Sequence, residues 1–176
     1  MIKPSGRSLV YEAQTQILDK PDQALLSSHG LTDAVEIWRM WAGAHAVPIW
    51  KDVDLMDLPN ALRGGTMVAD YLADEDDFRV RFWGVKLVDA FQIELTGKRL
   101  SDVFDRGVMT SFRETARSVL SDGKPQFLLH AITSAEGVRR QFPVVRLPIS
   151  DDGQTVSKIM TIENVDACLR SFANAV

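Results

Sequence analysis

The sequence is poor in residues that form cross-links or bind metals. Its 176 residues include one cysteine, Cys168, so no disulfide can form within the chain. The three histidines, His29, His45 and His130, are far apart, and no two have the spacing of metal ligands. We therefore expect no structural metal. Cys168 is predicted to be a small core residue, and a Cys–His nucleophile pair formed only in the fold stays an alternative.

Long apolar runs and an excess of positive charge are also lacking. No stretch approaches the roughly 18 apolar residues that span a bilayer, and the N-terminus lacks the apolar core of a signal peptide. The formal net charge of −4 argues against binding to nucleic acid or an acidic membrane, because both need a basic surface. The sequence thus predicts a cytoplasmic protein without nucleic acid or membrane among its partners.

Common catalytic motifs are absent as well. The sequence contains no G-x-S-x-G, H-E-x-x-H or G-x-G-x-x-G. A phosphate loop needs G-x-x-x-x-G-K-[ST], but Gly97-Lys98 is followed by Arg99, and no glycine stands five residues before Gly97. The acidic run Asp74–Asp77 is more typical of a solvated turn than of a metal site. These absences favour a binding or regulatory role over a nucleotide-dependent one.

What the sequence does have is the composition of a soluble globular protein, with 45% hydrophobic and 25% charged residues. Residues 1–32 are expected to form an N-terminal arm, with a short helix around Leu9–Leu18 as an alternative. A helix is predicted from Asp33 to His45, with Asp33 as its N-cap. The residues on one face of this helix include Ile37, Trp38 and Trp41. That face packs either on the chain's own core or on a second subunit, and the sequence leaves both open.

Five segments have the character of strands. They are residues 66–73, 78–83, 126–133, 139–149 and 155–165. In the second segment Phe78, Val80 and Phe82 alternate with polar positions, which predicts a half-buried antiparallel strand. A helical crossover, Val85–Ser121, separates the second strand from the third. Tight polar turns are expected at Ser134–Gly137 and at residues 151–153, and residues 166–176 are expected to form a short C-terminal helix.

This order of elements, together with four short motifs, resembles a PAS domain. The motifs are Asp57-Leu58-Pro59, Phe78–Gly84, Leu95–Leu100 and Leu147–Gly153. More narrowly, the chain resembles a bacterial branch of single-domain PAS proteins with a Trp-containing N-terminal helix. It departs from that pattern at Phe91–Glu94, where we expect a glycine. The resemblance implies an α+β fold over residues 33–165, with a five-stranded antiparallel sheet of order 2-1-5-4-3 and a helical crossover.

The resemblance also implies a sensory or regulatory module that binds a small ligand or a protein partner in signal transduction. Alternation and helix stripes suggest which residues form the walls of a ligand cavity, although plain core is the stronger explanation of the same pattern. These candidates are Phe82, Leu87, Phe91, Phe112 and Leu128. No cofactor is implied, because the crossover has neither the reactive-cysteine helix of flavin-binding relatives nor a histidine for haem. His130, on the third strand, is more typical of an ordinary core or surface residue.

Output from such a module requires a protein partner or self-association. PAS relatives often pair through a helix before the first strand, so a homodimer through Ile37, Trp38 and Trp41 is predicted. The alternative function is a small cone-shaped α+β enzyme, an isomerase or hydrolase acting on an apolar substrate. Such an enzyme needs a buried general base, and Asp89 is the only acid in the short helix after Gly84.

Overall fold

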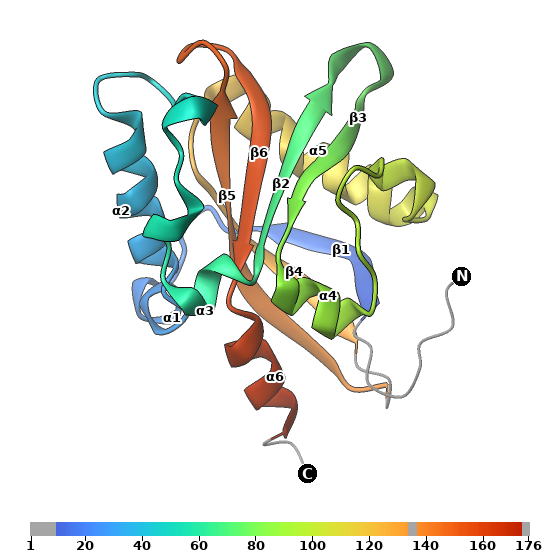
Figure 1. The fold of residues 1–176 in the computed structure, drawn as a ribbon. Helices are drawn as coiled ribbons and strands as arrows, with labels where there is room; N and C mark the ends of the chain where they lie inside the picture. Colours follow the sequence, from blue (N-terminus) through green and yellow to red (C-terminus); the bar gives the residue numbers. More distant parts are fainter. Residues whose placement is uncertain (1–9, 134–136, 174–176) are drawn as a thin grey trace.

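Antiparallel strands form one six-stranded sheet in the computed structural model, which describes residues 10–133 and 137–173 (Figure 1). The strands are β1 (Val10–Ile17), β2 (Thr66–Leu72), β3 (Asp77–Trp83), β4 (Gln126–Thr133), β5 (Arg139–Ser150) and β6 (Val156–Glu163). The α-helices are α1 (Gln23–Ser28), α2 (Leu31–Ala42), α3 (Asn60–Arg63), α4 (Val85–Phe91), α5 (Arg106–Asp122) and α6 (Val165–Ala173). Short 3-10 turns are η1 (Trp50–Asp52), η2 (Leu55–Asp57), η3 (Ala73–Glu75) and η4 (Leu100–Asp102).

The strand order across the sheet is β1-β4-β5-β6-β2-β3. Apart from β1, this is the predicted order 2-1-5-4-3, and the helical crossover lies between β3 and β4 as expected. The predicted bounds of β4 agree with the structure, and the predicted crossover, Val85–Ser121, ends one residue before helix α5 does at Asp122. The PAS-like fold predicted from the sequence is therefore confirmed, with one additional strand.

That additional strand, β1, lies in the segment predicted to be an arm, and it also corrects the alternative of a short helix around Leu9–Leu18. β1 pairs antiparallel with β4, for example Ile17 with Leu128, with an irregularity between Tyr11 and Thr15. Without β1, the outer edge of β4 would present unpaired backbone groups, which a neighbouring strand satisfies. The segment before residue 33 thus supplies a strand and a helix to the fold. Residues 1–9 of the predicted arm, 134–136 of the predicted turn and 174–176 of the C-terminal helix lie outside the described residues.

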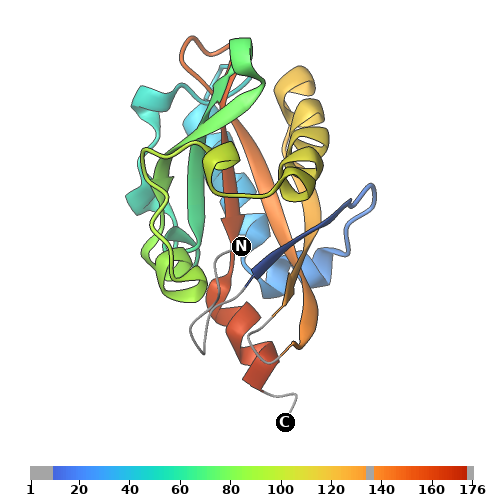
Figure 2. The same ribbon diagram turned by 90° about the vertical axis from the view of Figure 1, so that its right-hand side faces the viewer.

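Helices cover both faces of the sheet. Figure 1 shows α1–α3 on one side of the strands and α4 and α5 on the other, and the turned view in Figure 2 shows β1 running across the sheet close to α5. The first face carries a core of alternate strand residues, which includes Val68, Val145, Leu147, Met160 and Ile162. The opposite face carries a second core under the crossover. Because both faces are covered, alternation alone does not tell which side chains meet water.

Helix α2 begins earlier than predicted. Its N-cap is Gly30, which has a φ of 73°, so Asp33 lies in the first turn and is not the cap. A carboxylate in the first turn still interacts favourably with the positive end of the helix.

The two tryptophans of α2 lie in the core of the chain itself. Each is only 7% exposed. The Trp38 indole N–H donates to the backbone carbonyl oxygen of Pro148 at 2.7 Å, and that of Trp41 donates to the Asp57 carboxylate at 2.7 Å. Ile37 is half-buried beside the same core. Of the two alternatives left open by the sequence, the structure therefore favours packing on the chain's own sheet. Neither tryptophan ring is exposed for the predicted dimer contact.

The segment Phe91–Glu94, which lacks the glycine expected from the PAS pattern, contains the turn that ends helix α4. Gln92 ends α4 in the left-handed conformation, with a φ of 55°. Glycine adopts this conformation without strain, which explains why a glycine is expected there. The chain accordingly makes the same turn with a residue less suited to it.

Candidate functional site

A cavity of about 60 Å³ lies between the sheet and the crossover elements α4, η4 and α5. It is lined by Thr15, Gly65, Met67, Trp83, Leu87, Leu100, Phe104, Val108, Met109, Phe112, His130, Arg146, Thr161 and Glu163. The crossover contributes only apolar side chains, whereas the strands β4, β5 and β6 contribute polar ones. The cavity therefore has apolar walls and a polar floor, as small-molecule sites commonly do.

The polar floor follows from the register of the sheet. Arg146 of β5 lies directly across from Thr161 of β6, and Glu163 follows two residues later on the same face. His130 projects from β4 on the same side. All four side chains are at most 7% exposed. Burying charged groups costs free energy unless they interact with other polar groups, so this cluster is unusual for a face that otherwise forms a hydrophobic core.

Arg146 is held against helix α5. Its guanidinium lies 4.1 Å from the centroid of the Phe112 ring, a cation–π contact that gains strength where water is excluded. The same guanidinium donates hydrogen bonds to the Thr115 hydroxyl and, at 3.4 Å, to the Phe112 carbonyl oxygen. These contacts fix the position of the positive charge at the floor of the cavity.

His130 is neutral in the folded protein at ordinary pH. Burial and, secondly, the positive charge of Arg146 lower the pKa of His130 from 6.5 to about 3. The unfolded chain therefore binds a proton near pH 6.5 that the folded chain does not bind until about pH 3. Stability must consequently fall as the pH is lowered through this interval.

This linkage gives the first testable prediction. Between pH 7 and pH 4.5, His130 is expected to lower the free energy of unfolding by about 2–3 kcal/mol, and His130→Gln is expected to remove that loss. Urea denaturation at a series of pH values measures it. The control variant is His45→Gln, which changes an exposed side chain and should follow the wild-type profile. If the free energy of unfolding of His130→Gln falls with decreasing pH as steeply as that of the wild type, His130 is not the cause of the loss.

Of the five predicted cavity residues, the structure places two in the lining, Leu87 and Phe112. Phe91 packs beside Trp83, with ring centroids 6.4 Å apart, but is not part of the lining. Leu128 is buried in β4 and does not line the cavity either. Both belong to the surrounding core, which was the plain alternative for all five.

Phe82 lies on the opposite face of the sheet, against the core under α2. The cause is a β-bulge: Val68 pairs with Phe82 while Ala69 pairs with Val80, so Arg81 is an extra residue. One inserted residue reverses the facing of every side chain after it. Trp83 consequently lies in the same core as Phe78 and Val80, under the crossover, and it lines the cavity.

The sequence pattern does not predict the polar floor. Arg146 alternates with Val145 and Leu147, a pattern that ordinarily places the charged residue in water. A detectable signal did exist, because Arg146 is a lone charge in the apolar run Phe142–Ile149. A strand with such a run is buried on both faces, and a charge within it then has to be buried too.

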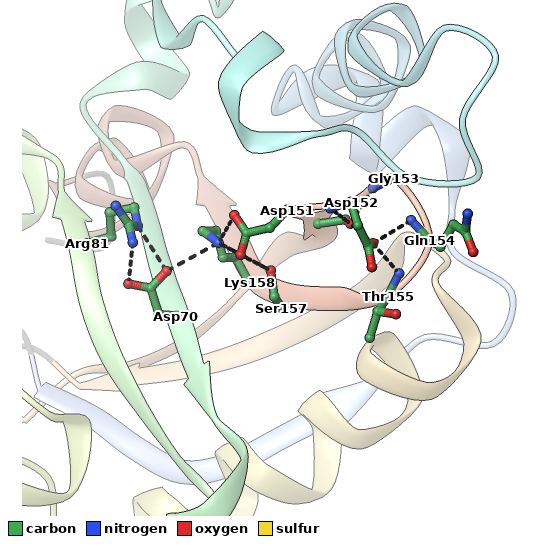
Figure 3. A network of polar contacts seen from close by, with 10 residues as sticks. Asp70, Arg81, Asp151, Asp152, Gly153, Gln154, Thr155, Ser157 and Lys158 are labelled. Atoms are coloured by element: carbon green, nitrogen blue, oxygen red, sulfur yellow. Dashed lines mark hydrogen bonds and ion pairs between the residues drawn. The ribbon is translucent and has the colours of Figure 1, made fainter.

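A second polar cluster lies at the turn between β5 and β6 (Figure 3). The Ser150 hydroxyl accepts the backbone N–H groups of Asp152 and Gly153 at 2.9 and 2.7 Å. The Asp152 carboxylate accepts a hydrogen bond from Ser150 and backbone N–H groups from residues 154 and 155, which lower the pKa of Asp152 to about 2. The polar residues of the motif Leu147–Gly153 therefore stabilise this turn.

The same turn is tied to the edge of the sheet. The Lys158 ammonium donates to the Asp151 carboxylate at 2.6 Å and lies 3.7 Å from Asp70, which accepts two hydrogen bonds from Arg81 (Figure 3). Every charge in this chain of contacts faces one of opposite sign. Within residues 10–133 and 137–173 no group of three or more His, Cys, Asp or Glu residues could hold a metal ion. The cluster is therefore a structural network, and the cavity is the better site candidate.

Comparison with known proteins agrees with this geometry. The model of the PAS domain family matches residues 26–162, and the chain belongs to that family. PAS domains are in general sensory modules without catalytic activity. Comparison with curated proteins gives no match. Among the described residues, no helix is long and apolar enough to cross a membrane.

One solved structure with a similar fold is described as that of an RNA-binding light-oxygen-voltage receptor. It has 14% sequence identity and a TM-score of 0.44, and the alignment covers 94% of this chain and 42% of that receptor. The chain thus spans less than half the length of the receptor. A likeness at this level carries no argument about what this chain binds.

Proposed function

We propose that this PAS domain is a sensor in signal transduction whose cavity binds a small molecule. The observation that carries the proposal is the buried polar floor beneath apolar walls. A purely structural core gains little from buried Arg and Glu side chains, because their desolvation is costly. A ligand site needs a few such groups to orient its ligand. The combination in one cavity therefore supports ligand binding over plain packing.

The floor of the cavity adjoins the start of helix α6, which we propose as the route of output. Glu163 is the last residue of β6, and α6 begins two residues later. The Asn164 side chain between them accepts the backbone N–H of Ala167 at 3.0 Å, which caps the helix. A ligand that displaces the end of β6 would therefore shift the start of α6. We propose that a protein partner reads this helix.

The predicted homodimer and the cytoplasmic location remain proposals. Because Trp38 and Trp41 are buried in their own chain, self-association would have to use another surface, and light scattering of the purified protein measures it. The alternative enzyme needs a buried general base in the cavity. Asp89 is exposed on α4 and does not line the cavity, whereas His130 and Glu163 do line it. What favours the sensor is the family, whose members are in general sensory modules. The sensory function is accordingly the one that we propose.

Native mass spectrometry tests the proposal. We expect freshly purified protein to carry an additional small mass that is released on unfolding. Val108→Phe should abolish it, because Val108 lines the cavity and is only half-buried, so the larger ring can fill the space without unfolding the chain. The matched control is Val85→Phe on α4, where the side chain is 65% exposed. A wild type without bound mass, or a Val108→Phe variant that retains it, would sink the proposal.

A further inference from the structure

The side chains of the cavity floor also indicate what kind of molecule binds there, an inference that rests on the proposed function. We propose that the ligand is a small neutral molecule with a hydrogen-bond acceptor and a donor on the same carbon, as in a primary amide. Its polar end would bind the Thr161 hydroxyl, between Arg146 and Glu163.

Thr161 provides the first step of the argument. It lines the cavity and is only 6% exposed, yet its hydroxyl oxygen makes no hydrogen bond to any described residue. Buried polar groups almost always have a hydrogen-bond partner, so each exception calls for an explanation. The other buried threonines of the sheet and crossover do not share this property. The hydroxyl of Thr66 donates to the Leu62 carbonyl oxygen at 3.0 Å, and that of Thr115 donates to the Ser111 carbonyl oxygen at 2.9 Å.

The charges on either side of Thr161 provide the second step. Arg146 is its register partner on β5, and Glu163 is the next residue of β6 on the same face, about 7 Å along the strand. A carboxylate bound at Thr161 would be attracted by Arg146 and repelled by Glu163, and an ammonium group would meet the reverse. A neutral amide suits both neighbours, because its carbonyl oxygen accepts on the Arg146 side and its N–H group donates on the Glu163 side.

The net charge of the site supports the same conclusion. The described lining side chains include one positive charge, Arg146, and one negative charge, Glu163. His130 is neutral there, because burial and the charge of Arg146 lower its pKa to about 3. A charged ligand would add a net charge to a buried site, which is costly. A neutral ligand adds none.

The size of the cavity and its remaining walls complete the description. A cavity of about 60 Å³ holds about four to six water-sized atoms. On the side of Thr161 away from Arg146, the register partner is Met67 of β2, and Trp83 is Met67's own partner on β3. The polar end of the ligand thus adjoins an apolar wall. The ligand should be short, with one apolar end and one amide-like end.

A set of four probes of matched size tests the inference by NMR titration of isotope-labelled protein. The probes are propionamide, propionate, propylamine and butanone, which has the shape of propionamide but no donor. We expect propionamide to bind at least about fivefold more tightly than each of the others. Thr161→Val, which replaces the hydroxyl with a methyl group, should weaken propionamide binding about fivefold. Thr161→Ser keeps the hydroxyl and should stay within about twofold of the wild type.

Thr32→Val is the control variant, because Thr32 lies on α2 at the opposite face of the sheet. It should bind propionamide like the wild type. Tighter binding of propionate or propylamine, no binding of any probe, or an unchanged affinity in Thr161→Val would each overturn the inference. None of these results touches the proposed sensor function, which depends on the bound mass in the wild type and its loss in Val108→Phe.

Discussion

Trp38→Ala is expected to lower the free energy of unfolding by about 4 kcal/mol, as truncation of a buried aromatic side chain commonly does. The side chain is 7% exposed and packs under α2 against the sheet. The variant also loses the hydrogen bond from the indole to the Pro148 carbonyl oxygen, which measures 2.7 Å. Urea denaturation followed by circular dichroism measures the loss.

Met40→Ala is the matched control on the same helix. Met40 is 60% exposed, so its truncation should change the free energy of unfolding by less than about 0.5 kcal/mol. Light scattering of Trp38→Ala also bears on the predicted dimer. If the wild type is a dimer and the variant is a stable monomer, Trp38 lies in a subunit interface, and its burial within one chain is contradicted.

Gly65→Ala is expected to lower the free energy of unfolding by more than about 3 kcal/mol, because the added methyl group collides with backbone. A Cβ at this position would lie 2.0 Å from the carbonyl oxygen of Glu163. The two chain segments cannot separate freely, since the Glu163 N–H donates to the Gly65 carbonyl oxygen at 3.1 Å. Denaturant unfolding measures the effect.

Gly97→Ala separates this collision from the general cost of replacing a glycine. Gly97 has a φ of 82° and nothing within 4 Å of an added Cβ, so its replacement should cost only about 1 kcal/mol for the left-handed backbone. Similar losses in the two variants would show that the contact at Gly65 relaxes, and the close approach at the cavity floor would then be unimportant for stability.

The elements that could be predicted from the sequence are those with strong local signals. The end of the crossover and the start of β4 are predictable because Gly123 and Pro125 end the helix directly before the strand. The facing of Phe82 could not be predicted in this way. The bulge at Arg81 arises from pairing with β2, and no local pattern within the strand announces it.

The site could be predicted only in part, for a related reason. Leu87 and Phe112 lie on helices, where an apolar stripe identifies the buried face reliably. The floor residues Arg146, Thr161 and Glu163 lie on strands whose two faces are both covered. Apart from Arg146, a lone charge in an apolar run, these polar residues resemble solvent-facing ones until the helices over each face are known.

Strand β1 has a consequence for how this domain is delimited. The family match begins at residue 26, after β1 has ended, yet β1 occupies the outer edge of β4 and its Thr15 lines the cavity. In complexes formed by strand addition, a foreign peptide occupies an open sheet edge of this kind. Here the chain supplies that peptide itself. A domain cut at the start of the family match would therefore expose the unpaired backbone groups of β4 and remove one wall of the cavity. Any strand with suitable side chains could then bind in the place of β1.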